Sequence, residues 1–192
     1  VQVQLAYSND INRPSYHQLR SSVIYVNRYM YDKGNPFLMP SITNNVTLGA
    51  SYKWMNLYVG YSHVKDDITN QTIAYSDDDP TIGLLTLQNT QAYDNLVAVF
   101  NINPTIGFWT PQLSLAIQKQ WYEGETPWGK AKFNKLIGSV TFRNNFKLPK
   151  GFLLDVNGSY TTKGYQKNIY LADDMFDMNA SLSKSFMKEK LT

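Results

Sequence analysis

The stretch INRPSYHQL (Ile11–Leu19), followed after a Tyr-rich spacer by GNPFLMP (Gly34–Pro40), decides the architecture of this chain. Because Pro14, Pro36 and Pro40 have no backbone donor, the middle of this stretch is predicted not to be a ladder strand. Connections this long are uncommon in compact domains unless they are functional or disordered, and the many aromatic and aliphatic side chains argue against disorder. We predict a structured external loop.

Runs that alternate apolar and polar residues flank this loop and recur along the whole chain. A period of two is present in residues 1–7, 45–52, 57–62, 93–103, 112–120, 136–148, 152–160 and 176–186. No segment has a comparable helical period. The predicted fold is therefore all-β: an antiparallel up-and-down meander of about eight strands, of the membrane β-barrel type, with each strand long enough to cross a bilayer if tilted.

Two features distinguish such a barrel from a soluble β-sandwich or jelly roll. Long connections (8–42, 69–89, 121–133 and 163–171) alternate with short ones (53–56, 103–110 and 147–151), as expected when one rim is external and the other periplasmic. The polar faces carry Asn, Gln, Ser, Thr and Gly, which suit a hydrated lumen, and aromatic residues end the strands, as in interfacial girdles. The sandwich stays open as the alternative.

Composition narrows the possible functions. The net charge is only +3 without a block of like charges, so nucleic acid is not an expected partner. The absence of cysteine excludes disulfides, thiolate metal sites and a cysteine nucleophile. With 192 residues, one region spanning 1–192 is expected, and no apolar run is long enough for a membrane helix.

With the strands placed, the opening stretch resembles the outer-membrane β-barrel region of TonB-dependent receptors. In that family an Arg-Pro pair, a Leu a few residues on, then Gly-Asn-Pro, a Leu and a second Pro join two late barrel strands at the outer rim. The matching positions are Arg13, Pro14, Leu19, Gly34, Asn35, Pro36, Leu38 and Pro40. Met39 and Ser41 depart from the pattern, since a Lys and a Glu are common there. These motif residues are expected to be structural.

The resemblance implies a non-enzymatic receptor and transport protein of the cell outer membrane, with this chain as the late, C-terminal part of its barrel. The ligand would be a bulky nutrient, namely a glycan, a chelated metal or a peptide, and no cofactor is expected. Implied partners are the lipid bilayer, the plug domain of the same receptor and, through it, the TonB system. The alternative function is that of a soluble or surface-exposed β-sandwich binding or structural module.

The family's barrels have about 22 strands closing around a plug, so the region is expected to be incomplete at both ends. Strand edges left open attract other chains. We therefore expect edge-strand self-association, or closure into a small barrel, if this piece is studied alone.

Aromatic residues near the outer connections are the candidate ligand-binding positions. Trp121, Tyr122 and Trp128 flank a Gly/Pro loop and could stack on a sugar or siderophore ring, or belong to the interfacial girdle. Tyr16 in the opening loop, with other tyrosines of the spacer (Tyr25, Tyr29 and Tyr31), could contact ligand at the mouth or pack the loop upon itself.

Polar candidates give weaker predictions. The run Asp77, Asp78, Asp79 could offer oxygen ligands to calcium, but it lacks the spacing of an EF-hand and suits a solvated loop, so no metal site is predicted. His17 and His63 have no partner nucleophile in the pattern, which argues against an enzyme. By parity, four polar side chains project from the polar face and are expected to make structural hydrogen bonds: Asp155, Asn157, Asp177 and Asn179.

Overall fold

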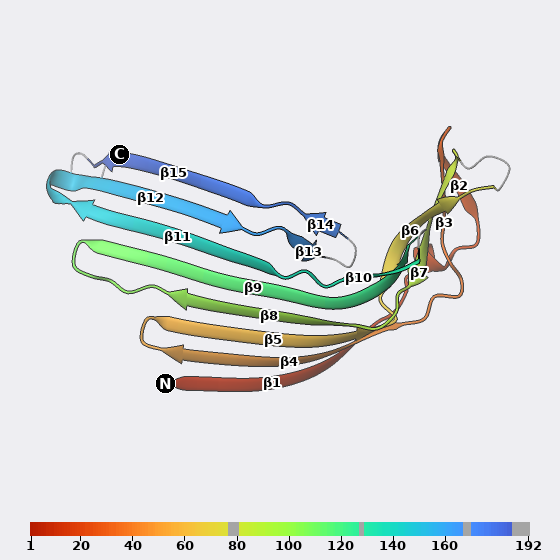
Figure 1. Ribbon diagram of the computed structural model, residues 1–192, viewed down its shortest axis with the longest axis horizontal. Coiled ribbons are helices and arrows are strands. Elements are labelled where there is room, and N and C mark those ends of the chain that lie inside the picture. The colour runs from red at the N-terminus through yellow and green to blue at the C-terminus, as the bar shows by residue number, and fades with distance from the viewer. Residues whose placement is uncertain (77–80, 127–128, 167–169, 186–192) are drawn as a thin grey trace.

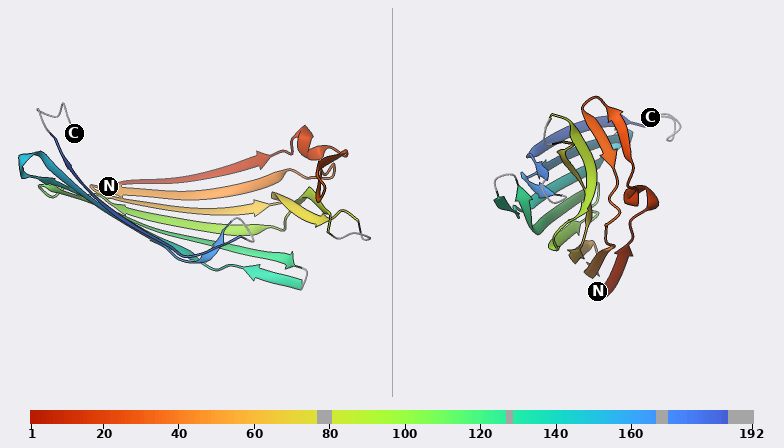
Figure 2. Two further views of the ribbon diagram at one scale, coloured as in Figure 1. Left: turned by 90° about the horizontal axis from the view of Figure 1, so that it is seen from above. Right: turned by 90° about the vertical axis from the view of Figure 1, so that its right-hand side faces the viewer.

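A single curved antiparallel sheet dominates the computed structural model, which describes residues 1–76, 81–126, 129–166 and 170–185 (Figures 1 and 2). Its strand order follows the chain, β1-β4-β5-β8-β9-β11-β12-β15, and β10 pairs with β9 off this path. The bounds are β1 Gln2–Asn12, β4 Ser41–Tyr52, β5 Met55–Lys65, β8 Tyr93–Ile102, β9 Trp109–Thr126, β10 Gly129–Phe133, β11 Ile137–Leu148, β12 Phe152–Thr161 and β15 Met175–Lys184. The predicted up-and-down meander is confirmed.

Short connections gather at one end of the sheet, called here the turn end. They are a two-residue turn between β4 and β5, residues 103–108 between β8 and β9, and the 3-10 turn η1 (Pro149–Gly151) between β11 and β12. Left-handed backbone closes these turns, with φ of 50° at Lys53, 59° at Gly107, 63° at Lys150 and 77° at Gly151. The predicted alternation of short and long connections is confirmed.

The long connections gather at the opposite end, the loop end, and contain more regular structure than predicted. They hold α1 (Tyr16–Leu19), β2 (Val23–Asn27), β3 (Met30–Lys33), β6 (Ile68–Ala74) and β7 (Gly83–Asn89). The four strands form a second sheet, the loop sheet, in the order β2-β3-β7-β6, in which β3 and β7 run parallel. In Figure 1 the loop sheet stands beyond the ends of β1, β4, β5 and β8.

Three loop predictions were wrong in detail. The opening loop does contain ladder strands, because its prolines lie outside Val23–Asn27 and Met30–Lys33 and leave every donor of this hairpin intact. Within 69–89, residues 69–74 and 83–89 are strand. Within the expected loop 121–133, residues 121–126 extend β9 and pair with β10 (129–133). The hairpin of β13 (Gly164–Gln166) with β14 (Tyr170–Ala172) occupies the connection after β12.

The sheet has one apolar and one polar face, and register partners keep them separate across the strands. Leu5, Leu48, Val59, Ala98 and Ile117 form one row of the apolar face, whereas Ser8, Asn45, Ser62, Asn95 and Gln120 form a row of the polar face. Apolar-face residues stay exposed, Leu5 at 72%, and the buried apolar residues among those described are only Leu38, Val64 and Ile137. A β-sandwich would bury one face under a second sheet, so that alternative is wrong.

The sheet is open at both sides. β1 and β15 are its two edges, and within the described strands they pair with β4 and β12 only. The expected small closed barrel is therefore not formed, and self-association through the edges stays a prediction. No helix among the described residues is long and apolar enough to span a membrane.

Candidate ligand-binding site at the loop end

The opening motif fixes the base of the loop sheet. Gly34 is buried, and a Cβ there would lie 2.5 Å from the Gln18 carbonyl oxygen and 2.7 Å from that of Arg20, so only glycine fits. Asn35 next to it donates its backbone N–H to the Gln18 carbonyl (2.7 Å) and its Nδ2 to the Leu87 carbonyl (2.9 Å). One motif residue thus joins α1 to β7.

Asn89, at the end of β7, makes a second link between the β1–β4 connection and the β5–β8 connection. Its Oδ1 accepts the Met39 backbone N–H (2.8 Å), and its Nδ2 donates to the carbonyls of Met39 (2.9 Å) and Asp66 (2.7 Å). Asp66 itself has a φ of 55°, which separates β5 from β6. An ion pair between Arg20 and Asp32 (2.7 Å) ties the residue after α1 to β3. The loop sheet is held by side-chain bonds to the backbone as well as by its own ladder.

Other motif positions have the contacts that a structural role requires. Pro14 leads into Ser15, whose hydroxyl accepts the Gln18 N–H while the Gln18 side chain accepts the Ser15 N–H, a capping box that starts α1. The spacing Ser-x-x-Gln at Ser15 and Gln18 is a local signal for a helix start, which hydrophobic periodicity does not reveal in a helix of four residues. Leu38 is buried, whereas Pro36 and Pro40 are exposed and Arg13 precedes the cap in exposed backbone.

Three tyrosines form a cluster on the loop sheet, here the tip cluster. Tyr31 of β3 stacks on Tyr75, which follows β6, with ring centroids 4.3 Å apart, and it meets Tyr25 of β2 edge-on at 5.7 Å. Tyr25 is 63% exposed, so the cluster packs the loops together and still offers rings to solvent. Tyr29 lies under the Arg28 guanidinium, and Tyr16 is 96% exposed without a ring partner among the described residues.

A second aromatic group, the mouth cluster, lies where the polar face meets the loop end. Tyr122 of β9 contacts Tyr93 of β8 edge-on (5.7 Å) and Phe133 of β10 (5.9 Å). Phe133 in turn meets Tyr165 of β13 at 5.2 Å, and Tyr93 donates its hydroxyl to the Asp67 carboxylate at 2.7 Å. Beside these rings the Gln120 amide, 1% exposed, donates to the Phe133 carbonyl. The rings are half-buried and held from four elements.

The predicted ligand-binding positions separate in the structure. Tyr122 belongs to the mouth cluster, but Trp121 lies on the apolar face, where the Lys119 ammonium sits 5.0 Å from its ring centroid. This position agrees with the alternative expectation that Trp121 belongs to the aromatic girdle at the membrane interface. A ligand-binding role for Tyr16 and Tyr122 stays a prediction. Trp128 and the run Asp77–Asp79 lie outside the described residues. His17 contacts Arg20 in the opening loop and belongs to none of the elements that supply the mouth cluster.

Hydrogen-bonded polar groups form a belt on the apolar face near the loop end. Asn44 accepts from the Tyr7 hydroxyl and from the Asn9 amide, both at 2.8 Å. Two strands on, Asp94 lies 2.8 Å from both the Tyr61 hydroxyl and the His63 Nδ1. Register pairs Asn9 with Asn44, Asn44 with His63, His63 with Asp94, and Asp94 with Trp121, so these residues form one continuous row across five strands. This row borders the apolar band of this face on the side of the loop end.

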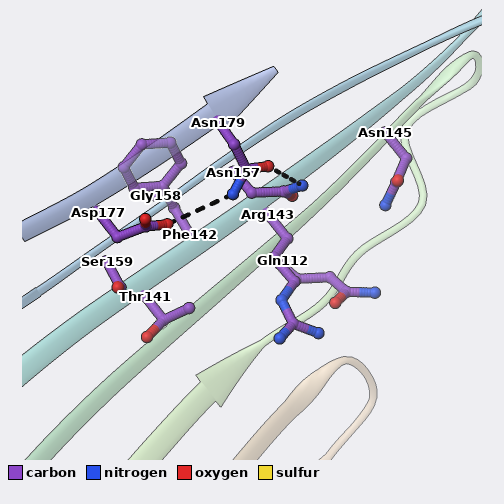
Figure 3. Close-up of a pocket in the computed structure, with 10 residues that line it drawn as sticks. All are labelled: Gln112, Thr141, Phe142, Arg143, Asn145, Asn157, Gly158, Ser159, Asp177 and Asn179. Atoms are coloured by element: carbon purple, nitrogen blue, oxygen red, sulfur yellow. Dashed lines mark hydrogen bonds between the residues drawn. The ribbon is translucent and has the colours of Figure 1, made fainter. Parts of the chain in front are cut away.

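The polar face carries the expected structural hydrogen bonds. Asn157 donates to Asn179 (3.2 Å), Asn179 donates to Asp177 (3.4 Å), and Ser181 donates to Asp155 (3.5 Å), as Figure 3 shows for the first two. The Asn157–Asn179 and Ser181–Asp155 bonds join β12 to β15, and the Asn179–Asp177 bond lies within β15. Among the described residues no three His, Asp or Glu side chains gather as a metal site would require.

A further ion pair lies at the base of the β13–β14 hairpin. The Lys163 ammonium donates to the Asp173 carboxylate, and this hydrogen bond, followed by the charge attraction, raises the pKa of Lys163 and lowers the pKa of Asp173. Both side chains are solvent-exposed, so the pair holds the hairpin weakly.

Comparison with known proteins identifies the protein family. The model of the outer membrane protein β-barrel family matches residues 1–192. The chain belongs to this family. In such barrels the apolar face meets lipid, the polar face lines the interior, short turns are periplasmic and long loops extracellular. The predicted outer-membrane localisation is confirmed, and the loop sheet with both aromatic clusters lies on the extracellular side.

A solved structure agrees with this family. The siderophore receptor PirA from Pseudomonas aeruginosa matches with a TM-score of 0.63 at 9% sequence identity, over 97% of this chain and 34% of that chain. The chain therefore spans about a third of the length of that receptor, and at this identity the likeness shows the fold alone. The comparison with curated proteins gives no sequence match.

Sequence reasoning missed four aromatic residues of the two clusters: Tyr75, Tyr93, Phe133 and Tyr165. Their signal is weak because Tyr75, Phe133 and Tyr165 come from three different connections, whereas Tyr93 begins β8. Tyr93 and Tyr122 are both on polar-face positions, so extending the alternation of β8 and β9 to their loop ends would have paired them.

Proposed function

We propose that this chain forms the barrel portion of a TonB-dependent receptor that takes up a bulky nutrient, such as a glycan, a chelated metal or a peptide, across the outer membrane. The siderophore receptor that shares its fold supports this reading, as does the Arg-Pro to Gly-Asn-Pro stretch at the base of the loop sheet. A plug domain of the same receptor would lie against the polar face and receive energy from the TonB system.

The observation that carries this proposal is the ordered loop end with its two aromatic clusters. Extracellular loops that served only as connections would not need the Asn35 and Asn89 bonds, the Arg20–Asp32 pair and a four-stranded sheet to hold them. Loops that are long and ordered are disproportionately functional. This framework holds the rings of Tyr25, Tyr31 and Tyr75 at the surface.

Each cluster has a distinct part in capture. The tip cluster offers exposed ring faces on which a sugar or a planar chelator stacks first. The mouth cluster, with Tyr122 at its centre, lies at the entrance to the polar face and takes the ligand next. Aromatic faces give large contact area at low entropic cost, and no step in this sequence requires a catalytic group.

Growth experiments on the three nutrient classes test the proposal. A host strain lacking the protein is compared with its complemented strain on a glycan, a chelated metal or a peptide as the sole source of the limiting nutrient, each with and without a functional TonB system. We expect one nutrient to support growth only when both the protein and TonB are present. Growth that depends on the protein but continues without TonB would count against the TonB-dependent mechanism.

A further inference from the structure

The inference concerns the polar face nearer the turn end, away from both aromatic clusters. Charged residues are sparse on the polar face of the main strands, and Arg143 of β11 lies in the middle of the hollow drawn in Figure 3. The hollow has a volume of about 470 Å³, and a second one of about 430 Å³ beside it also includes Arg143. Arg143 thus stands where two hollows of the barrel interior meet.

Neutral polar side chains surround this guanidinium. Register places Gln112 of β9 on one side of Arg143 and Asn157 of β12 on the other. Thr141 and Asn145 flank it on the same strand face and line the same hollow. Hydroxyl and amide groups of this kind can donate to an oxyanion as well as to water.

Arg143 makes no hydrogen bond or ion pair with any other residue in the described part of the chain. Two carboxylates lie on this face near Arg143, and each has another partner: Asp155 of the adjacent strand β12, opposite Asn145 and diagonal to Arg143, accepts from Ser181, and Asp177 of β15 accepts from Asn179. Asp177 lies two strands from Arg143, which is about 10 Å at the usual strand spacing. The five donors of the guanidinium are therefore available to a ligand.

We propose that Arg143 is the centre of an anion-binding site in the barrel interior that takes a carboxylate or phosphate group of a small solute. A planar guanidinium presents two parallel donors, which suit either anion in bidentate geometry, and Gln112 and Thr141 lie where they can hydrogen-bond the remaining oxygens. A nutrient that reaches this depth would be held by charge after it leaves the aromatic rings of the mouth.

The sheet supplies a matched control. Lys147 lies on the same strand and the same face, is also exposed, and takes part in neither hollow. Removing its charge changes the net charge as much as removing that of Arg143. A site-specific effect and a general electrostatic effect are thereby distinguished.

The test uses the protein at its natural length, purified from outer membranes in detergent, with succinate as the probe and succinamide as its uncharged counterpart. Binding is followed by saturation-transfer NMR for the wild type, Arg143→Gln, Arg143→Lys and Lys147→Gln, with gel mobility of unheated samples as the check of folding. We expect succinate but not succinamide to bind, Arg143→Gln to weaken binding about tenfold or more, Arg143→Lys to weaken it less, and Lys147→Gln to leave it within about twofold.

Three results overturn the proposal: absent succinate binding to the wild type, equal binding to Arg143→Gln, or an equal loss in Lys147→Gln. The first would arise if an acidic side chain from another segment of the polypeptide already occupied Arg143. Nutrient uptake does not enter this readout, so the anion site stands or falls separately from the proposed receptor function.

Discussion

Trp121 and Tyr122 are adjacent in sequence but lie on opposite faces of β9. Trp121 is on the lipid-facing side beneath the Lys119 ammonium, whereas Tyr122 is on the interior side between Tyr93 and Phe133. The period of two that builds the sheet thus places two neighbouring aromatic residues on opposite faces, Trp121 where a residue of the interfacial girdle would lie and Tyr122 in the mouth cluster.

Substitution at these two positions should separate stability from ligand binding. Trp121→Ala removes an interfacial ring and its cation–π contact, so we expect the free energy of unfolding to fall by about 1 kcal/mol, with nutrient uptake unchanged. Tyr122→Ala should lower nutrient affinity. Urea unfolding in lipid vesicles and uptake by whole cells measure the two effects, and uptake lost in Trp121→Ala alone would reverse the assignment.

Gly34 should not tolerate a methyl group. A Cβ at Gly34 would collide with the carbonyls of Gln18 and Arg20, so Gly34→Ala should loosen the loop sheet at a cost of about 1–3 kcal/mol. Gly49 is the control, because a Cβ there meets nothing within 4 Å. Trypsin added to intact cells should cut the opening loop faster in Gly34→Ala than in Gly49→Ala, and equal rates would show that the close approach is not constraining.

Asn89 should hold the second long connection to the first. Asn89→Ala removes three hydrogen bonds that join Met39 and Asp66, each with a net value of about 1 kcal/mol. Hydrogen exchange should speed up in β6 and β7 while β4 and β5 stay protected. Asn134→Ala, which changes an exposed asparagine between β10 and β11, is the control and should leave the exchange rates of β6 and β7 unchanged. An equal rise of these rates in Asn134→Ala would contradict the role given to Asn89.

The Lys163–Asp173 pair gives a pH dependence of the β13–β14 hairpin. The lowered pKa of Asp173 means that its contribution is complete above the ordinary value of 3.8 and is lost as pH falls through the lowered value. The raised pKa of Lys163 means that its contribution is complete below 10.5 and is lost as pH rises through the raised value. NMR titration of the Asp173 carboxyl should show its pKa moving up in Lys163→Met, and an unmoved pKa would contradict the pairing.

Alternation in the sequence was enough to predict the main sheet. Residues such as Val3, Leu5, Leu48 and Val59 are apolar at every second position because lipid contacts one whole face, and this constraint acts on each strand separately. The strand order could therefore be predicted without any knowledge of long-range contacts.

The loop end depended on contacts that no local pattern encodes. The parallel pairing of β3 with β7 and the stacking of Tyr31 on Tyr75 join segments more than forty residues apart. The prolines of the opening motif exclude a ladder strand only at their own positions, and Pro14 and Pro36 lie on either side of the β2–β3 hairpin. Tyr122 could be proposed from sequence, and Tyr93 follows from the alternation of β8 and β9, but Phe133 required the pairing of β10 with β9.

Cysteine scanning across β4, β5 and β8 tests most directly the claim that one face of this sheet meets lipid and the other lines a hydrated interior. These 192 residues contain no cysteine, so each variant adds a single thiol to this region, and the unsubstituted protein gives the background labelling. In intact outer membranes, a small water-soluble maleimide should label cysteines that replace Thr47, Ser62 and Asn95 but not cysteines that replace Leu48, Val59 and Leu96. A nitroxide label attached at the latter three positions should instead have its EPR lines broadened by oxygen dissolved in the lipid. Equal labelling of both sets would contradict a membrane-spanning barrel wall.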